Sequence, residues 1–366
     1  MGKRNMKIIL VLTNSSGGLY DFRGEFVEEL CKKYEVYVSM PDDVKEKELA
    51  ALGCRIIKTP INRRGINPLE DLKLFRAYGK IMKELRPSLV VTYTIKPNIY
   101  GGFAAAVKKI PYIATITGLG GAFDRTGPLL KLIVTMYRTG LKRAACVFFQ
   151  NEENKGIFRD MGITAKKTRM VMGSGVNLTK HSYEPYPERE ETHFLYVGRV
   201  MKERGILEYI EAARRLHGDK VFFDIMGYCD EDYQELLDDL EKEGVVRQIG
   251  FHTQVHTFLA SADAVVVASF HEGMSNALIE GAATGRPVIA SNISGCREAF
   301  EEGVTGLGFT PGKPEELIEA MSKFLSLSRQ ERAVMGRRGR EKMEREFDRK
   351  LVTAAYMDEV SGILHQ

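Results

Sequence analysis

Short apolar runs alternate with helix-like stretches along almost the whole chain, and this alternation limits the fold more than any other feature. In the first half, the runs that predict strands are 7–12, 35–39, 55–58, 88–93, 112–116 and 146–150. In the second half they are 193–197, 221–226, 246–249, 264–268, 287–290 and 306–309. Helical stretches lie between them, which predicts parallel sheets with right-handed crossovers. The expected class is α/β, with two doubly wound Rossmann-like domains facing each other across a cleft.

The domain boundaries follow from length and from one polar segment. A chain of 366 residues is too long for a single ordinary core. Residues 177–191 are polar, contain Pro185 and Pro187 and show little periodicity, so they are predicted to be a linker. We therefore expect an N-terminal domain over 1–176 and a C-terminal domain over 192–349. A last helix, from about 350 to 366, is expected to pack back on the first domain.

Charge is distributed unevenly along the chain. Residues 1–180 hold 31 Lys and Arg against 16 Asp and Glu, whereas the remainder holds 22 against 33. This asymmetry indicates either an anionic partner for the first half or attraction between the two domains, and both interpretations stay open. An anionic membrane surface or a lipid diphosphate suits a cytoplasmic protein. No aromatic-basic recognition motif is present, so nucleic acid is not expected.

Cysteine usage and hydropathy indicate a cytoplasmic location. The five cysteines are scattered, and none forms a Cys-x-x-Cys pair, so disulfides and zinc are not expected. No apolar run approaches the roughly 18 to 20 residues of a membrane span. The charged start runs directly into the first strand, without the pattern of a signal peptide. The predicted location is the cytoplasm, at the inner face of the plasma membrane as a peripheral protein.

The segment His271-Glu-Gly-Met-Ser-Asn-Ala-Leu-Ile-Glu280 carries the strongest functional signal. It follows the strand-like run 264–268 and opens a helix, which is where open α/β sheets bind ligands. Backbone N–H groups at a helix start favour anions such as phosphate. Two carboxylates, Glu272 and Glu280, flank the turn and suit the hydroxyls of a sugar or ribose. The segment therefore predicts a sugar-nucleotide site.

Cations follow the strand predicted at 193–197. Arg199 and Arg204 flank a short turn after Gly198, with Lys202 between them. Guanidinium groups bind a diphosphate bidentately, so this turn is a second candidate for the nucleotide. Asp230-Glu-Asp232 has the spacing of an acidic metal motif, but acids before a helix are more often dipole-favoured helix starts. No metal is expected.

The first half offers weaker candidates at its strand ends. Gly17 and Gly18 after the first strand allow close approach of a ligand to the backbone, but G-x-G-x-x-G is absent, which disfavours a dinucleotide oxidoreductase. Lys96 in Thr92–Asn98 and Thr117 in Thr115–Phe123 would face the cleft, with ordinary turn chemistry as the alternative. The helical stretch 128–143 is apolar with interspersed cations, and core packing is preferred over a membrane surface.

These residues resemble the retaining family-4 glycosyltransferases, which have the two-domain GT-B fold. The carrying motifs are Glu272-x7-Glu280, Gly198-Arg-Val with Arg204-Gly205, and Gly295 with Glu298 before Gly303-x-x-Gly306. The first half is most similar to enzymes that extend polyprenyl-diphosphate-linked sugars of capsules, O-antigens or N-glycans. That likeness rests on Tyr20, Phe22 and Arg23, on Asn67-Pro68, on Lys96-Pro-Asn98, on Ile110-Pro111 and on Gly118-Leu-Gly120.

The resemblance implies roles for particular residues. It implies that Arg199 and Arg204 hold the donor diphosphate, that Glu280 binds the ribose, and that Glu272 contacts the donor sugar. Further donor-binding candidates are Gly18, Gly198, Lys202, His252, Gly273, Met274, Ser275 and Asn276. Acceptor-side candidates are Tyr20, Arg23, Lys96, Asn98, Thr117 and Gly118. The family usually has Lys where this chain has Arg204, and many members have a first-domain His where this chain has Thr115-Ile-Thr117.

The expected reaction moves a sugar, an N-acetylhexosamine or related hexose, from a UDP-sugar to a polyprenyl-diphosphate-linked saccharide with retention of configuration. No cofactor or metal is required in this scheme, because fixed cations stabilise the leaving diphosphate. Glu272 is expected to act either as a nucleophile or as an electrostatic support, and both roles stay open. A sugar-nucleotide epimerase of the same fold and a non-catalytic sugar-nucleotide sensor are the alternatives.

Overall fold

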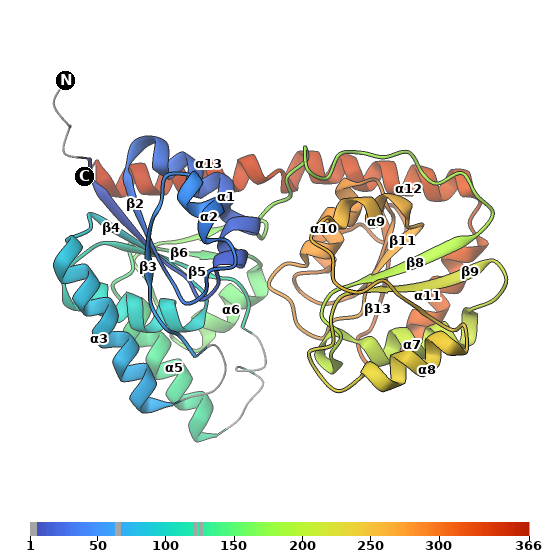
Figure 1. Cartoon of the computed structure of the whole chain (residues 1–366), viewed down its shortest axis with the longest axis horizontal. Helices are drawn as coiled ribbons and strands as arrows, with labels where there is room; N and C mark the ends of the chain where they lie inside the picture. Colours follow the sequence, from blue (N-terminus) through green and yellow to red (C-terminus); the bar gives the residue numbers. More distant parts are fainter. Residues whose placement is uncertain (1–5, 63–66, 120–122, 124–126, 366) are drawn as a thin grey trace. The chain divides into compact units, whose positions relative to one another are not determined.

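The computed structural model describes residues 6–62, 67–119, 123 and 127–365. The chain divides into two compact units (Figure 1). The first comprises Met1–Ser174 together with Leu351–Gln366, and the second comprises Gly175–Lys350. Among the described residues, no helix is both long enough and apolar enough to cross a membrane.

The first unit contains a parallel sheet of seven strands in the order β3-β2-β1-β4-β5-β6-β7. The strands are β1 (Ile8–Leu12), β2 (Glu35–Met40), β3 (Arg55–Lys58), β4 (Leu89–Tyr93), β5 (Tyr112–Ile116), β6 (Cys146–Phe149) and β7 (Thr168–Met170). Its helices are α1 (Ser16–Lys33), α2 (Glu46–Ala51), α3 (Pro68–Leu85), the π-helical turn η1 (Pro97–Gly101), α4 (Gly102–Val107), α5 (Pro128–Leu141), α6 (Glu152–Asp160) and α13 (Arg349–Leu364). The edge strand β7 has no counterpart among the sequence predictions.

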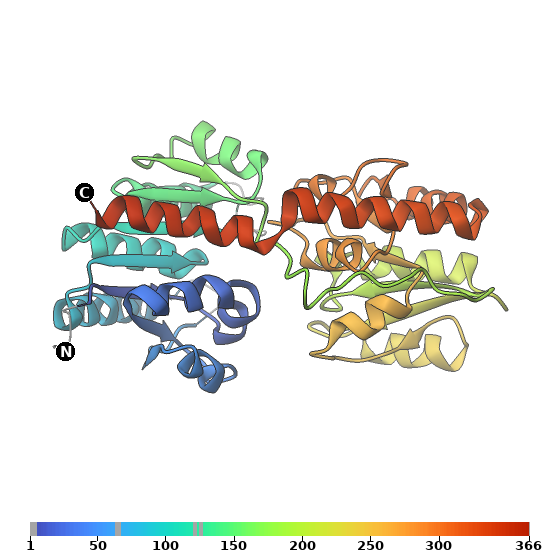
Figure 2. The ribbon, with the colours of Figure 1, turned by 90° about the horizontal axis from the view of Figure 1, so that it is seen from above.

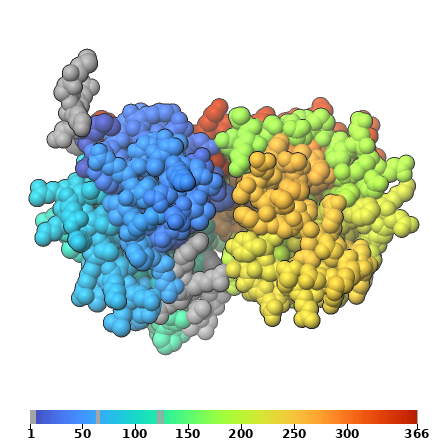
Figure 3. Space-filling view, viewed as in Figure 1, coloured from blue at the N-terminus to red at the C-terminus, as the bar shows by residue number. Residues whose placement is uncertain are grey.

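Helices cover both faces of this sheet because alternate residues of each buried strand point to opposite faces. Leu10 and Leu12 of β1 pack in a core beneath α3, α4 and α5, whereas Ile9 and Val11 pack in a core beneath α1, α2 and α13. The space-filling view shows α3 on the outside of the unit (Figure 3). The first unit is thus doubly wound, as predicted.

The C-terminal helix α13 belongs to the first unit. In Figure 2 it runs over the first unit, in about the same direction as the strands of that unit. The ring of its residue Tyr356 stacks on Phe148 at 4.1 Å between centroids, and the Tyr356 hydroxyl is 2.8 Å from Thr115 Oγ1. This helix therefore completes one face of the first sheet, although it follows the whole second unit in sequence.

The second unit contains a parallel sheet of six strands in the order β10-β9-β8-β11-β12-β13. The strands are β8 (Thr192–Val197), β9 (Val221–Met226), β10 (Arg247–Gln248), β11 (Ala264–Val267), β12 (Val288–Ser291) and β13 (Gly306–Phe309). Its helices are η3 (Lys202–Arg204), α7 (Ile206–Leu216), α8 (Gln234–Lys242), α9 (Val255–Ser261), α10 (Asn276–Ala283), η4 (Arg297–Ala299), α11 (Pro314–Ser326), α12 (Arg329–Lys342) and the π-helical turn η5 (Met343–Phe347). This strand order is that of a Rossmann sheet.

The segment predicted as an interdomain linker, 177–191, lies within the second unit instead. The backbone N–H of Glu184 donates to Thr284 O at 3.1 Å. The guanidinium of the buried Arg286 donates to the carbonyl oxygens of Glu184 and Pro185. The segment lacks hydrophobic periodicity because it packs on the second unit through its backbone. The chain passes from one unit to the other at Ser174–Gly175 and again at Lys350–Leu351.

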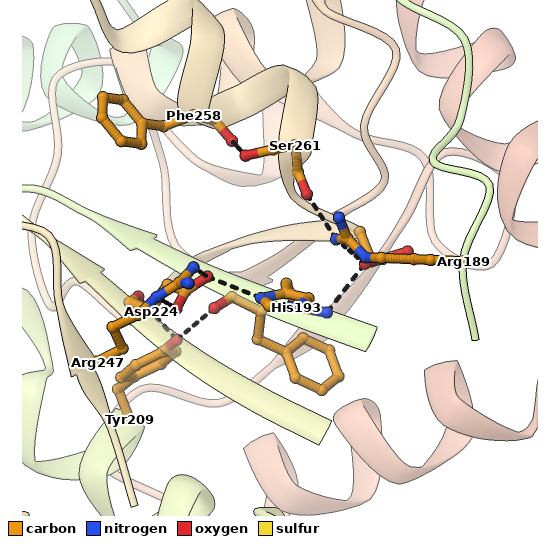
Figure 4. Close-up of polar contacts among 9 residues, drawn as sticks. Arg189, His193, Tyr209, Asp224, Arg247, Phe258 and Ser261 are labelled. Carbon is orange, nitrogen blue, oxygen red and sulfur yellow. Dashed lines mark hydrogen bonds and ion pairs between the residues drawn. The ribbon is translucent and has the colours of Figure 1, made fainter. Parts of the chain in front are cut away.

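A polar network holds the amino-terminal edge of the second sheet (Figure 4). Both oxygens of the buried Asp224 in β9 accept from Arg247, each at 2.8 Å, and Asp224 Oδ2 is 3.1 Å from His193 Nδ1. Arg189 donates to Asp263 at 2.6 Å. These bonds join residues at or just before the starts of β8, β10 and β11, together with Asp224 in the middle of β9.

Candidate donor-nucleotide site

The site is built at the carboxyl ends of β8 and β11, which are neighbours at the centre of the second sheet. The strand order reverses between them, since β9 and β10 extend the sheet to one side of β8 and β12 and β13 to the other side of β11. Such a reversal point is where doubly wound sheets bind nucleotides. The two motifs that the sequence singled out, 198–205 and 271–280, follow these two strands.

Gly205 brings the two turns into contact. Its backbone is left-handed, with a φ of 70°, and a Cβ at this position would lie 2.1 Å from Ala268 O at the end of β11. The N–H of Phe270 donates to Glu203 O at 3.0 Å, which joins the same two turns. Only glycine allows both this conformation and this close approach. The turn after β8 is therefore held against the turn after β11.

This contact places Arg204 beside Glu272. The Arg204 guanidinium forms an ion pair with Glu272 Oε1 and lies 3.4 Å from Ser269 Oγ. The Ser269 hydroxyl donates to the same Glu272 oxygen at 3.1 Å. The Glu272 side chain is only 9% exposed, whereas that of Arg204 is 30% exposed. The pair thus presents a cation to solvent above a buried carboxylate.

Burial raises the pKa of Glu272 above the usual range of a glutamate, although the positive charge of Arg204 opposes that shift. The carboxylate is supported from below by Gly295, where a Cβ would lie 2.9 Å from Glu272 Cβ. Gly295 N in turn donates to Glu298 Oε2 at 2.6 Å. The Gly295 and Glu298 motif therefore shapes the floor beneath Glu272, a role that sequence spacing does not reveal.

Helix α10 starts at this turn and carries Glu280 on its second turn. Ser275 precedes the helix, and its N–H donates to Gly295 O at 2.8 Å. The first turn of α10 itself contains no acidic residue, and the positive end of a helix favours anions. Glu280 Oε1 is 3.7 Å from Nε2 of the buried His181. Burial lowers the pKa of His181 to about 3, so this imidazole is neutral at physiological pH.

Arg199 is paired with an acid from a different loop. Its Nη1 is 2.5 Å from Oδ2 of Asp230, and the Lys202 N–H donates to Glu231 Oε2 at 2.7 Å. Asp230-Glu-Asp232 lies just before a helix, as predicted, since α8 begins at Gln234. Among the described residues, no group of three or more metal-ligating side chains is present.

His252 lies apart from these charges. Its side chain is exposed after β10, and its Nε2 is 3.1 Å from Ile249 O. The ring lies 4.5 Å from that of Phe258 in α9. Its position after the carboxyl end of β10 keeps it on the same edge of the sheet as the two turns. The prediction that His252 binds the donor remains a prediction.

Two family descriptions match the chain. The description "Glycosyl transferase 4-like" matches residues 7–151, and "Glycosyl transferases group 1" matches residues 183–342, so the second match contains both turns of the site, 198–205 and 271–280. The chain is a glycosyltransferase of this family. The family favours transfer over the epimerase and sensor alternatives.

Relatives and solved structures agree with this family. The glycosyltransferase is 28% identical to a Campylobacter jejuni N,N'-diacetylbacillosaminyl-diphospho-undecaprenol alpha-1,3-N-acetylgalactosaminyltransferase, over 86% of this chain and 88% of that protein. It is 26% identical to an Escherichia coli UDP-Gal:alpha-D-GlcNAc-diphosphoundecaprenol alpha-1,3-galactosyltransferase, over 66% and 67%. The Anabaena protein Alr3699/HepE in complex with UDP and glucose superposes with a TM-score of 0.80 at 18% identity, over 98% of this chain and all of that one. The fold is therefore GT-B.

In the first unit of the glycosyltransferase, several predicted acceptor-side residues are engaged inside the unit. Arg23 is 5% exposed and its Nη2 donates to Gly173 O at 3.2 Å. Asn98 is 1% exposed and bonds Thr115 O and Thr92 Oγ1 at 2.8 and 2.6 Å. Burial leaves little of either side chain accessible to an acceptor, which argues against the predicted contact, although Arg23 Nη1 has no hydrogen-bond partner among the described residues.

The other first-unit candidates lie nearer the surface of the glycosyltransferase. Lys96 pairs with Asp71 at 2.7 Å, and its side chain is 14% exposed. Tyr20 is half-buried beneath the ammonium group of Lys45. Thr117 is exposed, and Gly118, with a φ of 134°, follows it at the end of β5. Gly120, which belongs to the same motif, lies outside the described residues.

Gly18 lies at a helix start, and its contact with the donor remains a prediction. Gly17 and Gly18 belong to the first turn of α1, and Ser15 caps that helix by accepting from Gly18 N at 3.2 Å. The Ser16 N–H donates to the Asp42 carboxylate at 3.2 Å. This helix start therefore has its own internal acceptors, and Gly18 would meet a phosphate only by exchanging its bond to Ser15.

Proposed function

We propose that this glycosyltransferase moves a hexose or N-acetylhexosamine from a UDP-sugar to a polyprenyl-diphosphate-linked saccharide, with retention of configuration. The observation that carries the proposal is the Arg204–Glu272 pair at the reversal point of the second sheet, with Arg199 beside it on the same turn. The names of the Campylobacter and Escherichia relatives support the choice of a lipid-diphosphate acceptor and a nucleotide donor.

In this proposal the donor is bound by parts of the second unit. Arg199 and Arg204 hold the diphosphate, assisted by the N–H groups at the start of α10. Glu280 accepts from the ribose hydroxyls, and Glu272 faces the donor sugar. Gly198, Lys202 and the loop of His252 complete the surroundings of the nucleotide. Acceptor binding is proposed for the carboxyl edge of the first sheet, around Lys96 and Thr117.

The reaction breaks the bond between the anomeric carbon and the diphosphate oxygen and forms a bond from that carbon to an acceptor hydroxyl oxygen. The diphosphate gains negative charge as it leaves, and the two arginines stabilise that charge. Glu272 Oε1 already accepts from Arg204 and Ser269, which favours an electrostatic role for this carboxylate. The acceptor proton then passes to the leaving diphosphate. These fixed cations support a proposal of metal-independent transfer.

A donor screen followed by a transfer assay tests the function. Nucleotide sugars that bind should raise the melting temperature by mass action, and UDP-sugars are expected to raise it more than GDP-sugars. Transfer from the best donor to a synthetic polyprenyl-diphosphate saccharide should then yield an α-linked product from an α-linked donor, in EDTA as well as in buffer. Inverted product, strict dependence on added metal, or epimerisation of the donor without acceptor would each contradict part of the proposal.

Glu272 sets an expected pH dependence. Because burial raises its pKa, Glu272 takes up a proton at a higher pH than an exposed glutamate, and the pair with Arg204 is then lost. The acid limb of kcat/KM should therefore lie above the ordinary glutamate range and disappear in Glu272→Gln. The effect on folding stability runs in the opposite direction, because the folded protein favours the protonated form of Glu272. Its contribution to the free energy of unfolding is present below the ordinary pKa of a glutamate and is lost as the pH rises through the raised pKa of the folded state.

For the membrane partner, the proposal names the face formed by α4 and α5. The side of α5 that contains Ile133, Val134 and Tyr137 packs in the core, as predicted, but Leu132 remains 47% exposed. Phe103 and Val107 of α4 are 38% and 60% exposed. A groove of about 510 Å³ between the helices is lined by Phe103, Ala106, Val107, Arg138, Thr139, Lys142 and Arg143.

Charge supports an anionic bilayer as the proposed occupant of this α4–α5 face. From residue 95 to residue 151 the sequence contains eight Lys and Arg but a single acid, Asp124. Exposed apolar side chains surrounded by cations suit a surface of anionic lipid, where each basic residue contributes on the order of 1 kcal/mol. The wild-type enzyme should sediment with phosphatidylglycerol vesicles at low salt and not with phosphatidylcholine vesicles.

Paired substitutions test this assignment. Arg138→Glu with Lys142→Glu should abolish sedimentation, and Phe103→Ser with Val107→Ser should weaken it at high salt as well. Arg337→Glu with Arg338→Glu, on the exposed surface of α12, makes the same charge change in the second unit and should leave sedimentation intact. Equal loss in both charge variants would indicate only a net-charge effect.

A further inference from the structure

The loop that follows β9 is joined to the turn that carries Arg199. The Val200 N–H donates to Tyr228 O at 2.9 Å, and the Asp230 N–H donates back to Val200 O at 3.1 Å. A Cβ on Gly227 would lie 1.7 Å from Gly198 O, so the two loops approach as closely as glycine permits. These bonds prolong the pairing of β8 with β9 beyond the ends of both strands.

This connection brings the Asp230 carboxylate to the Arg199 guanidinium. The two groups are 2.5 Å apart, and the Asp230 side chain is 14% exposed against 39% for Arg199. The two residues come from different loops, 31 positions apart in the chain. The carboxylate is thus the less exposed partner, and it fixes the direction in which the more exposed guanidinium points.

Resting on the proposed role of Arg199 in holding the donor diphosphate, we propose that Asp230 is a positioning residue that also competes with the diphosphate for Arg199. A guanidinium ordered by a carboxylate loses less rotamer freedom when it binds phosphate, which favours turnover. The carboxylate also repels a diphosphate bound to the same guanidinium, which favours release of the UDP product. Asp230 would therefore keep product affinity low while keeping Arg199 in place.

Substitutions that separate charge from shape test this role. Asp230→Asn keeps an oxygen acceptor for Arg199 and removes the negative charge. We expect it to tighten UDP binding by about three- to tenfold and to lower kcat by a similar factor, so that KM and kcat fall together. A residue that only stabilised the loop would instead raise KM or leave UDP affinity unchanged. Asp230→Glu, which keeps the charge, should retain UDP affinity within about twofold of wild type.

Asp232→Asn is the matched control, because it removes the same charge from the same exposed loop two residues away. It should change the Kd for UDP by less than about twofold, and 0.5 M salt should abolish that change by screening. The change in the Kd for UDP caused by Asp230→Asn should persist at 0.5 M salt. It should vanish when Arg199 is already alanine, because a double-mutant cycle then detects the coupling between the two residues.

Calorimetric titration of UDP decides among the outcomes. If the wild-type enzyme binds UDP but Asp230→Asn leaves the affinity unchanged, the proposed role of Asp230 is wrong, while the proposed donor stands. The same conclusion follows if Asp230→Asn and Asp232→Asn change the affinity equally. Absence of UDP binding to the wild-type enzyme would overturn the proposed donor and this inference with it. Melting temperatures of each variant without UDP show whether the substitution has unfolded the loop. Asp230→Glu, which keeps the charge, serves as a second comparison. A variant that melts like the wild type has lost only the contact with Arg199.

Discussion

Replacement of Arg204 by alanine is expected to lower kcat by roughly 10²- to 10³-fold, the usual loss when one preorganised group that stabilises developing charge is removed. Two effects combine. The leaving diphosphate loses a cation, and the 9%-exposed Glu272 carboxylate loses the counter-ion that opposes its burial. Single-turnover rates at saturating UDP-sugar measure the first effect without interference from donor affinity.

Arg204→Lys is the control for this prediction. Lysine keeps the charge but not the planar fork, so it should recover much of the rate if charge dominates and little if bidentate geometry does. The same variants separate the two effects by pH. In Arg204→Ala the pKa of Glu272 should rise further, which moves the acid limb of kcat/KM to higher pH. A wild-type rate in Arg204→Ala would remove this arginine from the proposed chemistry.

The sheets could be predicted from sequence because strands buried on both faces appear as continuous apolar runs. This holds for β4, β5 and β11, which are buried throughout. The prediction missed β7, because an edge strand of three residues with an exposed Thr168 has no such run. The sequence pattern also predicts the first helix only over 22–33, whereas α1 starts at Ser16, because the capping bond of Ser15 allows Gly17 and Gly18 to be helical.

The positions of the site charges were less predictable than the strands. The turns 198–205 and 271–280 follow neighbouring strands, so their convergence follows from the strand order. The ion pairs within the site do not follow from the strand order. Arg204 and Glu272 are 68 residues apart, and Asp230, the partner of Arg199, appears in the sequence only as an acid before a helix. Arg23 and Asn98 are likewise buried, and each donates a hydrogen bond to a backbone carbonyl far along the chain, Gly173 O and Thr115 O. Local pattern does not determine such long-range pairing.

Gly205→Ala is expected to cost about 3 kcal/mol of folding stability and to abolish most UDP binding. The left-handed backbone alone costs an alanine roughly 1–2 kcal/mol, and overpacking adds about 1–3 kcal/mol. The added Cβ would lie 2.1 Å from Ala268 O, a backbone atom that cannot move without displacing the end of β11 and, four residues on, Glu272. Urea unfolding and UDP titration measure the two losses separately.

Gly244→Ala separates backbone strain from the contact with β11. Gly244 has a similar φ of 76°, but a Cβ there would meet no atom within 4 Å. This variant should lose only about 1–2 kcal/mol of stability and keep its affinity for UDP, because Gly244 ends α8 away from both turns. If Gly205→Ala proved no worse than Gly244→Ala in both measurements, close contact between the two turns would not be what holds Arg204 beside Glu272. The donor site would then depend on the Phe270–Glu203 backbone bond, which alanine at position 205 leaves in place.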